Sequence, residues 1–112
     1  MATQTGNGKL EGKVALITGI GGGQGREAAL RFAAEGATVV GCDIDAATAA
    51  ETLAAVRSAG WDADIAATAV DLGDPEQART WVEAAAERHG RIDVVYNNGS
   101  AAKFGHDRRT VR

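Results

Sequence analysis

The sequence has 112 residues and a net charge of −3, and its 45% hydrophobic and 24% charged residues are typical of one small globular domain. A single cysteine, Cys42, excludes an internal disulfide and favours a reducing, cytoplasmic location. We expect no secretory signal, because the N-terminus has no apolar core, and no membrane span, because no apolar run approaches ~20 residues. Residues 1–8 are small and polar and are expected to form a flexible lead.

Strand patterns recur at regular intervals along the chain. Apolar runs predict strands at residues 13–18, 37–42 and 92–96, and residues 64–70 form a weaker candidate. Continuous apolar runs of this length are typical of parallel strands that are buried on both faces.

Three helices are expected between these strands. The first covers residues 25–35, the second runs from Asp45 to just before Gly60, and the third runs from Asp74 to about His89. Asp45 and Asp74 are predicted N-caps, because their carboxylates can accept N–H groups of the first helical turn. The expected buried stripes are Ala29, Phe32 and Ala33, then Ala46, Ala49, Ala50 and Leu53, and then Ala78, Trp81, Val82 and Ala85.

The order of these elements, β-α-β-α-β-α-β with short connections, predicts the α/β fold class. Because crossovers between parallel strands are right-handed, we expect one parallel sheet of four strands with helices on its faces. A doubly wound sheet normally continues beyond its fourth strand, so residues 9–100 are expected to be a partial, half domain.

The last residues differ in charge from the rest of the chain. Residues 101–112 (AAKFGHDRRTVR) are basic, whereas the residues before them are acidic overall. A basic segment can bind nucleic acid, but one short tail on an acidic domain is a weak electrostatic footprint. We therefore expect an irregular C-terminal tail and no nucleic-acid partner.

The stretch TGIGGGQG, residues 18–25, joins the first strand to the first helix. Glycines let a phosphate approach the backbone closely, and the helix N-terminus that follows presents N–H groups and partial positive charge. The spacing Gly23-x-Gly25-x-x-Ala28 fits the dinucleotide fingerprint G-x-G-x-x-G/A of Rossmann-like folds. No Gly-Lys-Ser/Thr follows, which excludes a P-loop. A flexible turn at a strand end remains the alternative.

Asp43 stands 18 residues after Gly25, directly after the second apolar run. The fingerprint expects an acidic residue at about this place, where it binds the adenosine ribose hydroxyls. A carboxylate there repels a 2′-phosphate, so Asp43 favours NAD over NADP as the cofactor. A solvated loop acid or a helix-capping group remains the alternative.

Four segments together resemble the short-chain dehydrogenase/reductase family. They are the T-G-x-x-x-G-x-G spacing of residues 18–25, GCDID at 41–45, VDL at 70–72 and YNNGS at 96–100. The resemblance covers about residues 9–100. It implies an oxidoreductase that transfers hydride between a nicotinamide cofactor and a small-molecule alcohol or ketone. It also implies that the full-length enzyme can be a homo-oligomer.

The resemblance also implies roles for individual residues. Gly19, Ile20, Gly23, Gln24 and Gly25 would line the pyrophosphate and nicotinamide side of the cofactor, and Asp43 would hold the adenosine ribose. Ile44, Asp71 and Leu72 would contact the adenine, and Asn97, Asn98 and Gly99 match the Asn-Asn-Ala-Gly motif near the cofactor ribose. The alternatives are a turn acid for Asp71, ordinary packing for Leu72 and plain turn chemistry for the asparagines.

The sequence departs from the family in two places. Asn-Asn-Ala-Gly reads Asn-Asn-Gly-Ser here, a small change that should preserve the turn. Catalysis in the family depends on a Tyr and on a Lys four residues later, but the single tyrosine is Tyr96, and Ser100 stands four residues on. Lys103 has the wrong spacing, and His89 and His106 have no metal-ligand spacing. We expect no catalytic residue, no metal site and no activity from these residues alone.

Three interpretations therefore stay open. The first, a truncated or partial short-chain dehydrogenase, explains all four matching segments. The second is a non-catalytic dinucleotide-binding or interaction module. The third is a methyltransferase-like domain, against which Thr18 and the Asn-Asn turn count.

Overall fold

The computed structural model describes residues 8–98 of the chain, so Gly99, the basic tail and most of the expected N-terminal lead lie outside it. The four strands are parallel and form one sheet, as the alternating pattern predicted. Their spatial order in the sheet is β3-β2-β1-β4. In chain order the elements are β1 (Val14–Thr18), α1 (Gly23–Ala34), β2 (Thr38–Cys42), α2 (Ala46–Ser58), β3 (Asp64–Ile65), α3 (Pro75–His89) and β4 (Val94–Asn97).

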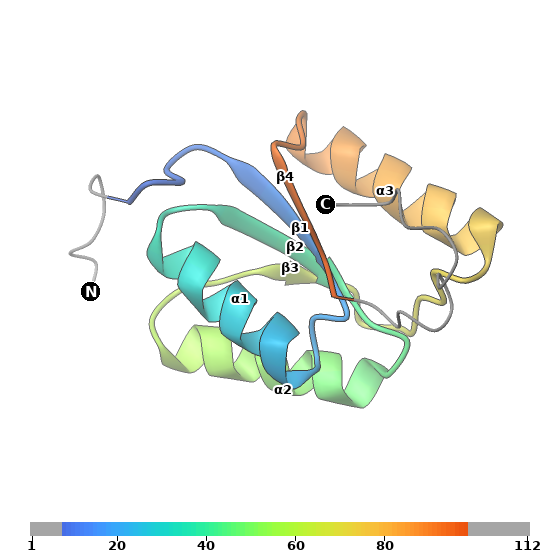
Figure 1. Cartoon of the computed structure of the whole chain (residues 1–112), viewed down its shortest axis with the longest axis horizontal. Coiled ribbons are helices and arrows are strands. Elements are labelled where there is room, and N and C mark those ends of the chain that lie inside the picture. The colour runs from blue at the N-terminus through green and yellow to red at the C-terminus, as the bar shows by residue number, and fades with distance from the viewer. Residues whose placement is uncertain (1–7, 99–112) are drawn as a thin grey trace.

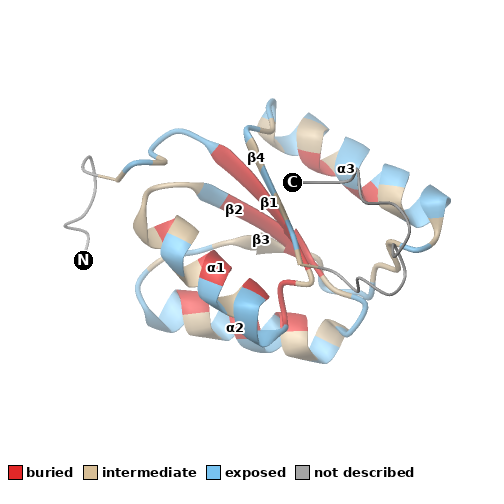
Figure 2. Cartoon of the chain, viewed as in Figure 1, coloured by how far each residue is buried: buried red, intermediate tan, exposed pale blue. Residues whose placement is uncertain are grey.

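Helices cover both faces of the sheet, with α1 and α2 on one face and α3 on the other (Figure 1). The core on the first face comprises Ile17, Ile20, Ala28, Ala29, Ala33, Val39, Ala49 and Val56. The core on the second face comprises Val14, Leu16, Val40, Cys42, Trp81 and Ala85. Every residue of β1 is buried, whereas β4 alternates between half-buried and exposed (Figure 2). The continuous apolar run of β1 therefore reflects its place between β2 and β4.

Two strands are shorter than the apolar pattern predicted. β3 pairs with β2 only through Asp64 and Ile65, and the chain leaves β2 after Ala66, whose N–H donates to the Gly41 carbonyl at 2.9 Å. The prediction of a strand over residues 64–70 was therefore wrong beyond Ile65. β4 begins at Val94 instead of residue 92, because the Asp93 carboxylate accepts the Val14 N–H at 2.9 Å.

The helix ends follow the expected capping chemistry. The Asp45 carboxylate accepts the N–H groups of Ala47 and Thr48, and the Asp74 carboxylate accepts the N–H of Glu76. Gly90 ends α3 in the left-handed conformation, which glycine adopts without steric cost. α1 begins at Gly23, two residues before the expected start, because the last glycines of the loop are already helical.

The buried faces of α2 and α3 differ from the predicted stripes. In α2, Ala49 is buried but Ala50 is exposed, and Thr52 and Val56 complete the buried face. Thr52 is polar, so the apolar pattern did not include it. In α3, Trp81 and Ala85 are buried as predicted, whereas Val82 is 39% exposed.

Trp81→Ala should lower the free energy of unfolding by about 3 kcal/mol, because the indole fills the space between α3 and the sheet. Val82→Ala on the same helix is the matched control and should cost less than about 0.5 kcal/mol. Urea unfolding followed by circular dichroism measures both values. Equal losses for the two variants would contradict this placement of α3.

Candidate functional site

The expected site residues lie at the carboxyl edge of the sheet. The register places Thr18 of β1 level with Cys42 of β2 and with Asn97 of β4. The glycine loop, Asp43 and Asn98 follow directly after these three strand ends. In open α/β sheets this edge is where ligands bind, at the point where the strand order reverses. That point is here between β1 and β4, because β2 follows β1 on one side and β4 lies on the other.

Three glycines of the loop are required by the packing of the chain itself. Gly19 has a φ of 64°, which glycine adopts without strain. A Cβ on Gly25 would lie 2.9 Å from the carbonyl carbon of Gly19 and 2.9 Å from the Cα of Ile20. A Cβ on Gly21 would lie 2.8 Å from the backbone nitrogen of Ala49 in α2. The loop thus contacts both the start of α1 and the first turns of α2.

The packing of the chain does not require glycine at the other two glycine positions of the loop, Gly22 and Gly23. Both are exposed, an added Cβ on Gly23 would meet nothing within 4 Å, and one on Gly22 would meet only the Gly19 carbonyl oxygen at 3.8 Å. Gly22 is also the N-cap of α1, and among the helices of residues 8–98 α1 alone begins without a side-chain cap. An open helix N-terminus with bare backbone suits an anion such as a pyrophosphate.

Ile20 and Gln24 lie on different sides of the loop. Ile20 is fully buried, its N–H donates to the Cys42 carbonyl at 3.1 Å, and its side chain packs over Gly41. Ile20 therefore supports the loop from below instead of facing its open side. Gln24 is exposed and lines a shallow cavity of about 400 Å³ between α1 and β4, together with Phe32 and Tyr96.

The Asp43 carboxylate is held in place by two backbone donors. Its Oδ2 accepts the N–H of Gly21 at 2.8 Å, and its Oδ1 accepts the N–H of Asp45 at 2.9 Å. A carboxylate has about four acceptor positions, so two hydrogen bonds do not saturate it. Asp43 is half-buried, and the next residue, Ile44, is 51% exposed. The contact with Gly21 places the carboxylate directly beside the glycine loop.

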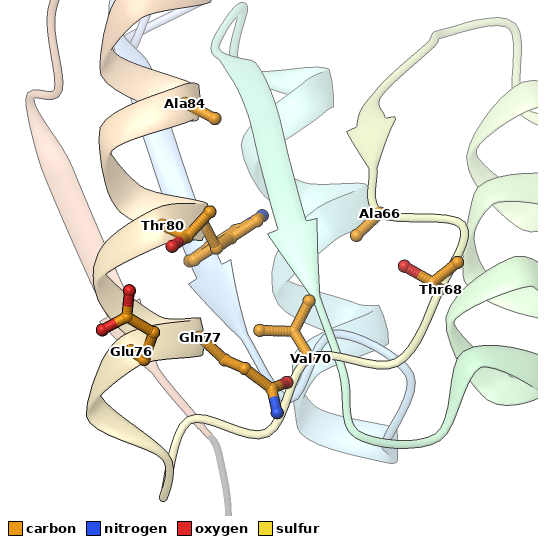
Figure 3. A pocket seen from close by; sticks show the side chains of 8 residues that line it. Ala66, Thr68, Val70, Glu76, Gln77, Thr80 and Ala84 are labelled. Atoms are coloured by element: carbon orange, nitrogen blue, oxygen red, sulfur yellow. The ribbon is translucent and has the colours of Figure 1, made fainter.

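Asp71 and Leu72 make contacts that fit a turn acid and a core-packing residue, the two alternatives to adenine binding. The Asp71 Oδ1 accepts the N–H of Gly73 at 2.9 Å, which is a turn contact, and Leu72 packs against the core on the α3 face. The segment is joined to Asp43 through Val70, whose N–H donates to the Asp43 carbonyl at 3.0 Å. A cavity of about 370 Å³ lies beside it, with the side chains of Val70, Gln77 and Thr80 at its wall (Figure 3).

The two asparagines tie β4 to β1. The Thr18 hydroxyl donates to the Asn97 Oδ1 at 2.7 Å and accepts the N–H of Asn98 at 3.0 Å. The Asn98 Nδ2 also donates to the Gly19 carbonyl at 3.3 Å. These bonds fix the first residues of the glycine loop relative to β4. Gly99, the third residue of the expected motif, lies outside the described residues.

Two residues at this edge were missed by the sequence interpretation. The Arg26 Nε donates to the Thr52 hydroxyl at 2.9 Å, and that hydroxyl donates to the Ile20 carbonyl at 2.9 Å. Thr52 is fully buried and Arg26 is half-buried. The available signal was helical spacing, because Thr52 lies three residues after Ala49 and four before Val56.

Residues 8–98 hold no cluster of three or more His, Cys, Asp or Glu side chains that could bind a metal ion. A search of the same residues finds no helix with the length and hydropathy of a membrane span.

The sequence matches the short chain dehydrogenase family over residues 13–110. It is 39% identical over 97 residues to levodione reductase of Leifsonia aquatica, covering 87% of this chain and 36% of that protein. A hydroxysteroid dehydrogenase structure from Escherichia coli is similar with a TM-score of 0.72 and 33% identity, over 79% of this chain and 37% of that one. The structure of carveol dehydrogenase from Mycobacterium avium in complex with NAD is similar with a TM-score of 0.69 and 33% identity. The match covers 79% of this chain and 35% of that one. The chain thus spans about a third of the length of these relatives.

Cys42 lies directly before Asp43 and is buried in the α3-side core. Burial raises the pKa of its thiol to about 12, and the negative charge of Asp43 adds to the increase. The neutral thiol is therefore the form present in the folded chain at pH 8, and this form is unreactive.

We expect the native chain at pH 8 to react with Ellman's reagent at least about a hundredfold more slowly than the urea-unfolded chain. The absorbance of the released thiolate measures the two rates. Fast labelling of the native chain would contradict the burial of Cys42 behind Asp43.

Proposed function

Because the chain belongs to the short-chain dehydrogenase/reductase family, we propose that residues 9–100 form the NAD-binding part of a cytoplasmic oxidoreductase of this family. The full reaction would be hydride transfer between the nicotinamide and a small alcohol or ketone. The cofactor supplies the hydride when it is bound. The residues described here would bind and orient it.

One observation carries the proposal. Gly22 and Gly23 have no packing neighbour that excludes a side chain, and they stand at the one uncapped helix N-terminus of the described chain. Exposed glycine backbone that the packing of the chain does not require leaves space for a bound ligand. Partial positive charge at this helix end favours a negative group such as a pyrophosphate.

Asp43 supports the choice of NAD over NADP. Its carboxylate is fixed beside the loop by Gly21 and Asp45, and it retains acceptor positions for two ribose hydroxyls. A 2′-phosphate at this place would meet a like charge. The NAD-bound carveol dehydrogenase structure agrees with a dinucleotide ligand in this family.

The sequence supports cofactor binding by these residues without catalysis of the full reaction. A Tyr followed four residues later by a Lys does not occur in the 112 residues, because Tyr96 is the single tyrosine. The Tyr96 ring contacts the Phe32 ring edge to face at a centroid distance of 5.9 Å, which is a packing role. We propose that the proton-transfer groups and the substrate pocket belong to other parts of the complete enzyme.

Gly23→Ala tests the binding proposal. The fold should remain intact, because the added methyl meets no protein atom and alanine is the better helix former. The affinity for NAD should fall at least about tenfold, or ~1.4 kcal/mol, because the methyl occupies the ligand side of the loop. Isothermal titration calorimetry with NAD and S-adenosylmethionine gives the values, and stronger binding of the latter would favour the methyltransferase interpretation.

Gly25→Ala is the matched control for an added methyl that acts on the fold, because its Cβ would overlap the Gly19 backbone. It should lower the free energy of unfolding by about 1–3 kcal/mol through overpacking. Unchanged NAD affinity in folded Gly23→Ala would overturn the proposed binding site.

Asp43→Ala tests the cofactor preference. NAD affinity should fall at least about a hundredfold, because two hydrogen bonds to a charged group are lost and each is worth about 1.5–3 kcal/mol. The advantage of NAD over NADP should narrow, because the repulsion of the 2′-phosphate is removed. Asp62→Ala, an exposed acid after α2, is the control for net charge. No change in either affinity would exclude the ribose contact.

A further inference from the structure

We propose that Thr52 is a positioning residue that, together with Arg26, sets the orientation of the Asp43 carboxylate through the peptide bond between Ile20 and Gly21. The inference rests on the proposed function, because Asp43 is the residue proposed to select NAD. It assigns a binding role to α2, an element that contributes no residue to the expected site.

The first step is the contact between α2 and the glycine loop. The Thr52 hydroxyl donates to the Ile20 carbonyl oxygen at 2.9 Å and accepts from the Arg26 Nε at 2.9 Å. Thr52 is fully buried, so water cannot replace these two bonds. Because α1 and α2 lie side by side on one face of the sheet (Figure 1), a side chain from each helix can meet under the loop.

The second step follows from the planarity of the peptide group. The carbonyl of Ile20 and the N–H of Gly21 belong to one rigid plane and point in opposite directions. When Thr52 holds the carbonyl downward, the Gly21 N–H must point away from α2. The structure places that N–H on the Asp43 Oδ2 at 2.8 Å. Thr52, the peptide and Asp43 thus form one continuous chain of hydrogen bonds.

Arg26 strengthens the same arrangement. Its Nη2 donates to the carbonyl oxygens of Gly21 at 3.2 Å and of Thr48 at 3.4 Å, so the next peptide of the loop is held as well. The guanidinium is also 3.3 Å from the Glu51 carboxylate, but this pair is exposed and contributes little energy. The absence of a side chain at Gly21 lets the loop lie close enough to α2 for these bonds.

Thr52→Val in the 112-residue chain removes the hydroxyl at nearly constant volume. In the absence of ligand, hydrogen exchange of the Gly21 amide, measured by NMR, should become at least about tenfold faster, because the peptide group that carries this N–H is released from Thr52. The exchange of Val40 in β2 should change much less. Equal acceleration at both amides would indicate general destabilisation and overturn the positioning role.

The second readout is cofactor selectivity in calorimetric titrations. Thr52→Val should weaken NAD binding about tenfold and leave NADP binding nearly unchanged. A less ordered Asp43 carboxylate binds the ribose hydroxyls of NAD more weakly, but it also repels the 2′-phosphate of NADP less. Thr52→Ser keeps the hydroxyl and should restore the preference for NAD. Thr38 is an exposed threonine of β2, so Thr38→Val is the control for the effect of replacing a threonine by a valine as such.

The outcomes separate the two proposals. A wild-type chain that binds no NAD overturns the proposed function and the selectivity role of Thr52 with it. A wild-type chain that prefers NAD, with the same preference in Thr52→Val, overturns this inference alone. Unchanged Gly21 exchange in Thr52→Val overturns the inference whether or not NAD binds.

Discussion

The close approach of Gly25 to the backbone of Gly19 and Ile20 is the constraint on which the rest of the structure depends. It turns the chain at the end of β1 so sharply that α1 begins at Gly23 and directs its N-terminus at the carboxyl edge of the sheet. A side chain at residue 25 would push the helix away from β1. This would weaken the packing of α1 on the sheet and shift the glycine loop, which lies beside Asp43.

Much of the fold could be predicted from the sequence because its determinants are local. The Asp caps of α2 and α3 and the left-handed Gly90 act within one or two turns of a helix. The length of β3 was not predictable in this way, because it depends on how far the chain pairs with β2. The buried face of α2 was missed for a related reason. Thr52 is buried because the Ile20 carbonyl accepts its hydroxyl, and that contact joins segments 32 residues apart.

The site shows the same division between local and non-local determinants. The sequence located the glycine loop and Asp43, since both are defined by spacing after apolar runs. It could not separate the glycines needed for internal packing, such as Gly21 and Gly25, from the exposed Gly22 and Gly23. The family resemblance grouped Ile20 with the residues that would line the cofactor, and the structure places the Ile20 side chain in the core below the loop. Only the packing of α2 against the loop distinguishes these roles.

The carboxyl edge of the sheet is built around β1, which has a parallel partner on each side within the described chain. Thr18 is therefore fixed from both directions, by β2 and by the two asparagines at the end of β4. β4 has one partner there, and its Val95 is 49% exposed although the paired Leu16 is 3% exposed. The glycine loop is nevertheless held mainly from the other side, by the Cys42 carbonyl at the end of β2, by Asp43 and by Thr52 of α2. From the end of β4, Asn98 adds one bond to the Gly19 carbonyl. The proposed dinucleotide binding depends on these contacts, whereas the Tyr-x-x-x-Lys spacing on which the family's catalysis depends does not occur in the 112 residues.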